Sequence, residues 1–176
     1  MDEATKVERW PALRKDDAGL EKELRTILTA RALGNPYGSD GDFAKNLTSL
    51  PLGLRAMAAT HWLDISLTLD SITWHFGNFG ESGLVAATEA GLLELGLLEL
   101  AWCFHEAKEL MMPLISERAD SEDSDDVLER KGLQQFAEEL NRKARALRDT
   151  PSRKSAIYEA WIRYARQHPE HVFDPQ

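Results

Sequence analysis

Four side chains on two predicted helices have the chemistry and the spacing to bind a metal ion. His61 and Asp64 are three residues apart, and His105 and Glu109 are four apart. On a helix, either spacing places both side chains on one face, where helix bundles hold their metal ions. His75 could add a third imidazole. The Glu-x-x-His spacing of carboxylate-bridged sites occurs in neither helix, so we predict surface or hydrogen-bonded core histidines, with no bound metal or other cofactor.

Other catalytic signatures are weak or missing from the sequence. Gly77, Gly80 and Gly83 lack the preceding strand and the following lysine of a phosphate loop, and they favour a helix turn. No G-x-S-x-G nucleophile motif occurs. The single cysteine, Cys103, lies in an apolar stretch, which predicts a buried and inert thiol. The sequence therefore favours a non-catalytic protein, with a metal-dependent enzyme as an alternative.

A group of aromatic residues lies across the end of one predicted helix. Tryptophan and phenylalanine dominate core packing, so a core cluster is the favoured interpretation. The alternative is an exposed aromatic turn that binds a protein partner or a ligand. The side chains of that predicted partner site are Trp74, His75, Phe76, Asn78 and Phe79.

The charge is negative and unevenly distributed. The net charge of −9 argues against a nucleic-acid-binding protein, since phosphate contacts need a basic face. Residues 1–126 carry a net −12, whereas residues 127–176 carry a net +3. The acidic part could attract a basic partner. Carboxylates are densest in a predicted solvated linker at about 116–126. This linker contains the second set of predicted partner-binding residues: Asp120, Glu122, Asp123, Asp125 and Asp126.

The sequence shows neither a signal peptide nor a stretch that could span a membrane. Residues 1–7 are charged and lack an apolar core. The longest apolar stretch, residues 92–114, is interrupted by charged side chains and falls short of about 20 consecutive apolar residues. We expect a cytoplasmic protein.

Helical periodicity dominates the elements that would position these residues. Apolar side chains recur at i, i+3, i+4 and i+7, and no segment alternates as a half-buried strand does. The pattern predicts one all-α domain over residues 1–176, an irregular bundle of about six helices. Their expected spans are 16–33, 51–76, 83–94, 97–112, 124–148 and 150–168, with a long loop at 34–53.

Particular residues are expected to set the helix ends. Gly96 predicts a break, and Pro113 is expected to terminate the fourth helix. Thr150 is expected to cap the last helix, with Pro151 at its first position, and His168-Pro169 is expected to end it.

Three segments resemble the bacterial DNA-mimic-like family of small helical proteins. The resemblance runs over residues 50–80, 84–107 and 156–173. An aromatic turn with an asparagine, a helix–Gly–helix unit and a closing Tyr-containing helix carry it. The matching residues are Trp74-His75-Phe76-Gly77-Asn78, Leu92-Leu93-Glu94-Leu95-Gly96, Tyr164, His168-Pro169-Glu170 and Phe173. The resemblance implies an all-helical fold, frequent homodimerisation, no catalytic activity and, in at least one member, an acidic mimic of duplex DNA.

Three hypotheses for function follow. The first is a protein whose acidic N-terminal two thirds binds a basic partner, such as a DNA-binding protein that the acidic surface occupies in place of DNA. The second is an immunity-type or regulatory protein that recognises one partner through the aromatic turn. The third is a metal-dependent enzyme that uses His61, Asp64, His75, His105 and Glu109.

Overall fold

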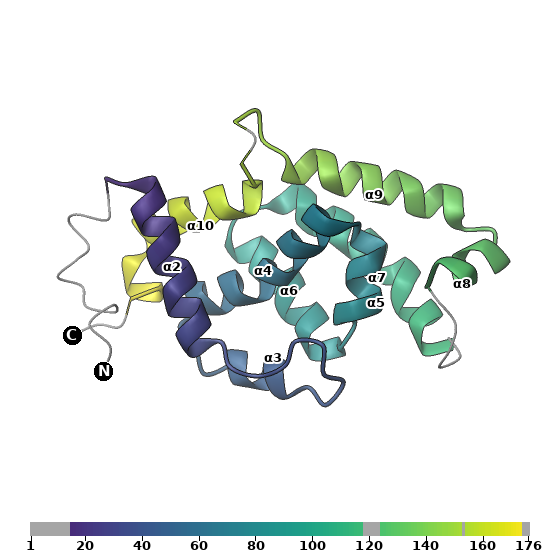
Figure 1. The fold of residues 1–176 in the computed structure, drawn as a ribbon, viewed down its shortest axis with the longest axis horizontal. Coiled ribbons are helices and arrows are strands. Elements are labelled where there is room, and N and C mark those ends of the chain that lie inside the picture. The colour runs from purple at the N-terminus through teal and green to yellow at the C-terminus, as the bar shows by residue number, and fades with distance from the viewer. Residues whose placement is uncertain (1–14, 118–123, 153, 174–176) are drawn as a thin grey trace.

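The computed structural model describes residues 15–117, 124–152 and 154–173, and regular structure within them is helical (Figure 1). These residues form nine α-helices, one 3-10 turn and no β-strand, which confirms the predicted all-α class. The elements are α2 (Asp17–Arg31), α3 (Asp42–Leu47), α4 (Leu52–Leu69), α5 (Ile72–Phe79), α6 (Ser82–Glu94), α7 (Leu98–Glu117), α8 (Ser124–Arg130), α9 (Gln134–Arg148), α10 (Ala156–Gln167) and η3 (Pro169–His171).

Helix α4 is the centre of the fold. It buries side chains around nearly its whole circumference, as expected for a helix that other helices surround. Helix α6 packs most extensively against it, and α5, α9 and α10 also contact it. Gly91 permits the close approach of α6, because an added Cβ would lie 2.9 Å from the carbonyl oxygen of Ala56. One continuous cluster of buried apolar side chains joins the helices into a single domain.

The outer helices are amphipathic and cover this centre from several sides. In Figure 1, α9 lies along the upper edge, α2 and α10 lie side by side at one end, and α8 lies at the other. Helix α9 buries Ala137, Leu140 and Ala144 and turns its charged side outward. Across the described residues, no helix combines the length and the apolar character needed to cross a membrane.

The predicted number of helices was wrong, because two helix breaks and one short helix were not recognised. The expected helix at 51–76 is divided between Asp70 and Ser71, where the Ser71 hydroxyl accepts a hydrogen bond from the backbone N–H of Trp74 and caps α5. The expected helix at 124–148 is divided at Gly132, whose φ of 68° is left-handed. The expected loop at 34–53 contains the short helix α3.

Pro113 does not end its helix. Helix α7 continues through it to Glu117. Pro113 lies on the exposed side, where water can bond the carbonyl that the missing proline N–H leaves open. Met111 and Leu114 on the opposite side remain buried, so packing favours the longer helix.

The last helix begins later than expected. Its N-cap is Ser155, whose hydroxyl accepts a hydrogen bond from the Ile157 N–H, so the prediction of Thr150 as the cap was wrong. The Thr150 hydroxyl instead donates to the carbonyl of Lys154, within a turn that an isolated bridge between Asp149 and Ser155 closes. The expected helix at 16–33 is observed as α2, Asp17–Arg31. The break at Gly96, whose φ is 73°, and the helix end at His168 are also confirmed.

Candidate functional site

The predicted aromatic turn is a helix, α5, whose inner side belongs to the core. His75, Phe76 and Phe79 are fully buried, and the Phe76 and Phe104 rings lie 4.9 Å apart between centroids. Trp74 and Asn78 are half-buried, and the Asn78 side chain donates to the Trp74 carbonyl. A partner could therefore reach only the outer atoms of this turn, and its role in binding stays a prediction.

Burial also sets the protonation of His75. The pKa of its imidazole falls to about 3, chiefly because burial disfavours the charged form. The Ser66 hydroxyl donates to the Trp62 carbonyl and lies 2.9 Å from His75 Nδ1, so it accepts the Nδ1 proton. His75 is thus a neutral core residue.

Asp64 lies at the centre of a buried polar hub that joins α4, α9 and α10. Its side chain is 3 % exposed, and Arg148 Nε donates to its Oδ1 at 3.0 Å. The Ser155 hydroxyl donates to the same oxygen. Arg148 also donates to the Thr68 hydroxyl at 2.6 Å. The carboxylate is therefore paired and hydrogen-bonded, as a buried charge must be.

His61 lies beside this hub, with its own partners. Its Nδ1 is 3.1 Å from the Tyr158 hydroxyl, and the Arg25 guanidinium lies 4.1 Å from the centre of the Tyr158 ring. Burial and then the Arg25 charge lower the pKa of His61, whereas burial and the Asp64 carboxylate raise the pKa of Tyr158 to about 12. Both side chains are therefore neutral at pH 7, and Tyr158 retains its proton.

His105 and Glu109, the second predicted metal-binding pair, lie on α7 and contact different side chains. His105 Nδ1 lies 2.7 Å from a Glu89 oxygen, and Lys108 binds the other Glu89 oxygen at 2.7 Å. Glu109 Oε1 lies 3.8 Å from Lys108 Nζ. None of the five predicted metal ligands belongs to the group of three, among the described residues, whose ligand atoms lie within 4.8 Å of one another. That group is His168, Glu170 and His171.

Cys103 and the acidic segment complete the predicted residues. Cys103 is fully buried, and burial raises the pKa of its thiol to about 11, as expected for an inert thiol. Asp125 and Asp126 are exposed in the first turn of α8, where carboxylates favour the helix dipole. Asp120, Glu122 and Asp123 lie outside the described residues.

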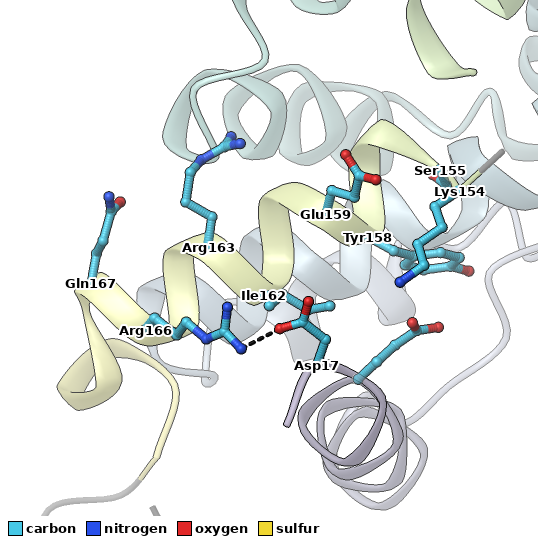
Figure 2. A pocket seen from close by; sticks show the side chains of 10 residues that line it. Asp17, Lys154, Ser155, Tyr158, Glu159, Ile162, Arg163, Arg166 and Gln167 are labelled. Carbon is cyan, nitrogen blue, oxygen red and sulfur yellow. Dashed lines mark hydrogen bonds and ion pairs between the residues drawn. The ribbon is translucent and has the colours of Figure 1, made fainter. Parts of the chain in front are cut away.

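A groove of about 460 Å³ lies between α2 and α10 (Figure 2). Arg166 reaches across it to form an ion pair with Asp17. Arg163 points away from Asp17 in this view, and its guanidinium donates to the Leu95 carbonyl at 3.1 Å. Basic and acidic side chains are mixed along the walls, so the groove does not select a ligand by charge: they are Lys154, Arg163 and Arg166, and Asp17, Glu21 and Glu159.

The outer face of α7 presents an exposed tryptophan among carboxylates. Trp102 is 69 % exposed and Leu98, one turn earlier, is 57 % exposed. The 3.6-residue period places both on one side of the helix, away from the buried Cys103, Phe104 and Ala107. We call this face the α7 stripe: Leu98, Glu99, Trp102, His105, Glu106 and Glu109, all exposed. Glu106 forms an ion pair with Lys143 of α9 at 2.8 Å.

The spacing of residues in the sequence could have predicted the α7 stripe. Leu98, Trp102, Glu106 and Glu109 recur at i, i+4, i+8 and i+11, a helical spacing that mixes apolar and acidic residues on one face. The other apolar residues of this helix form a separate buried face, so the core does not require Trp102.

Comparisons of the chain with protein-family models, curated proteins and solved structures gave no match.

Proposed function

We propose that this protein works by binding a basic protein partner through the α7 stripe. The supporting observation is Trp102, which is 69 % exposed on a helix whose opposite side is fully packed. Tryptophan is among the residues that contribute most to interfaces, because covering its large apolar ring removes much surface from water.

The charge around Trp102 defines the chemistry of the partner. Glu99, Glu106 and Glu109 share its face of the helix. Carboxylates at the rim of an apolar contact attract a basic surface, speed the encounter and make it sensitive to salt. The expected counterpart is therefore a basic surface or helix with an apolar side chain at its centre.

A DNA-binding protein is the narrower class of partner that we propose. Such proteins carry basic surfaces for phosphate contacts. The net charge of −9 and the resemblance to the DNA-mimic-like family support this choice. It predicts that duplex DNA competes with this protein for the same partner.

The test is capture of partners from the native lysate on immobilised protein, at low and at high salt. We expect wild type to retain one basic protein that high salt releases and that Trp102→Ala fails to retain. Phe136→Ala is the matched control, because Phe136 is a 48 % exposed aromatic residue on α9 outside the stripe. Far-ultraviolet circular dichroism should show that all three proteins are equally helical.

Other outcomes separate the alternatives. A partner retained at high salt and lost in Trp74→Ala, with the fold intact, would favour the aromatic turn as the interface. Light scattering that shows a dimer in wild type and a monomer in Trp102→Ala would make a second copy of the chain the occupant. If Trp102→Ala captures the same basic protein as wild type, the proposal fails.

A further inference from the structure

Three potential metal ligands converge where the chain turns after α10. The sequence His168-Pro169-Glu170-His171 ends the helix and forms η3. His168 Nδ1 and His171 Nε2 each lie 3.8 Å from the same Glu170 oxygen, Oε1. The two imidazole rings are stacked, with centroids 5.5 Å apart and planes 11° from parallel. The ligand atoms of the three side chains all lie within 4.8 Å of one another.

The Tyr164 hydroxyl behind His171 determines which ring nitrogen of the neutral imidazole carries the proton. The Tyr164 hydroxyl donates its proton to a Glu94 carboxylate oxygen at 2.5 Å, and it lies 3.0 Å from His171 Nδ1. Because the Tyr164 hydroxyl proton is donated to Glu94, the Tyr164 oxygen can only accept the Nδ1 proton of His171. The lone pair of the neutral ring is then on Nε2, which is the nitrogen that faces Glu170. Metal-binding histidines are held in the same way by a hydrogen bond from their other nitrogen.

The backbone beneath the three ligands is anchored. The N–H groups of Val172 and Phe173 donate to the Pro169 carbonyl at 3.1 and 2.8 Å, and both side chains are buried. Gly53 of α4 lets the turn approach, because an added Cβ would lie 2.9 Å from the His171 carbonyl oxygen. The ligand side chains themselves are reachable from solvent, at 46 % exposed for His168, 59 % for Glu170 and 41 % for His171.

We propose that His168, Glu170 and His171 bind a divalent transition-metal ion, with zinc as the ion that fits best. Bonds of about 2.0–2.2 Å in a tetrahedral site place ligand atoms roughly 3.4 Å apart, so each imidazole nitrogen needs to come about half an ångström closer to the Glu170 oxygen. The two exposed rings, now nearly parallel, must also turn so that both lone pairs point at the ion. Imidazole ligands select zinc over magnesium and calcium. Three protein ligands leave a fourth position for water or for an outside group.

The test is a zinc titration of the full-length protein, purified without a polyhistidine tag, in competition with a chromophoric chelator. We expect one zinc ion per chain in wild type. His168→Ala and His171→Ala should each weaken binding at least tenfold, and Glu170→Gln should also weaken it. His105→Ala is the matched control, because it removes an exposed histidine elsewhere and should leave the affinity unchanged.

A fifth variant tests the residue behind the site. Tyr164→Phe keeps the ring and removes the acceptor of the His171 Nδ1 proton, so zinc affinity should fall by about tenfold or more. X-ray absorption at the zinc edge should report two nitrogen and at least one oxygen neighbours in wild type. Two results overturn the proposal: wild type that binds no zinc, or zinc affinity that is the same in wild type, His168→Ala and His171→Ala.

Discussion

Two carboxylate-bearing regions of this protein differ in burial, since one is enclosed by helices and the other is exposed to solvent. In the buried hub, Asp64 is 3 % exposed and accepts hydrogen bonds from Arg148 and Ser155. On the α7 stripe, Glu99, Glu106 and Glu109 surround a tryptophan that is 69 % exposed. Both regions contain carboxylates, and their surroundings differ.

The comparison shows why residue type and spacing alone do not define a site. The pair His61 and Asp64 has metal-binding spacing, yet Arg148 and Ser155 already occupy the carboxylate. The stripe contains the other predicted pair, His105 and Glu109, and its side chains are exposed to solvent. In the hub the polar groups hold three helices together, whereas the carboxylates of the stripe are exposed, two of them beside lysines.

The largest effect is expected from breaking the hub. Asp64→Ala removes the buried partner of the Ser155 hydroxyl and of the Arg148 guanidinium, which keeps the exposed Asp149, and we expect it to lower the free energy of unfolding by about 3 kcal/mol. Urea denaturation followed by circular dichroism measures this. The double variant Asp64→Leu with Arg148→Met removes both charges and should be clearly more stable than Asp64→Ala. Equal losses in the two variants would contradict a charge-based role for the hub.

A smaller, pH-dependent effect is expected from another polar group of the interior. His75 has a pKa of about 3 in the folded state, against an ordinary value of 6.5 when unfolded. Between these values the unfolded chain binds a proton that the folded chain does not, so stability is present above pH 6.5 and falls as the pH is lowered. The slope from this residue is about 1.4 kcal/mol per pH unit.

Replacing His75 tests this linkage. Urea denaturation of wild type between pH 7 and pH 5 should show the loss of stability, and His75→Phe should show a shallower slope over the same range. A variant with the same slope as wild type would mean that His75 is not the group that couples folding to the proton.

The smallest effect on stability is expected on the α7 stripe. Trp102→Ala should change the free energy of unfolding by no more than about 0.5 kcal/mol, because an exposed side chain away from special contacts contributes little. Thermal and urea denaturation measure this change. A loss of several kcal/mol would place Trp102 in the packing of the domain and remove the contrast between the two regions.

Sequence reasoning succeeded where the signal was local. The period of apolar residues identified α2, and Gly96 marked a real break. It failed at Pro113 and Thr150, where packing of Met111 and Leu114 and the capping of α10 by Ser155 prevailed over the local preference. Ser71 and Gly132 were readable signals of helix ends that a continuous apolar stripe concealed.

The sequence by itself determined the all-helical class, the acidic balance and most of the helix faces. These depend on backbone periodicity and composition, which act over a few neighbouring residues. Only the tertiary structure decided that Asp64 meets residues 84 and 91 positions away, that α5 packs inward, and that the ligand atoms of His168, Glu170 and His171 lie within 4.8 Å of one another. A helix stripe specifies which side is buried, but the partner of each polar group depends on long-range packing.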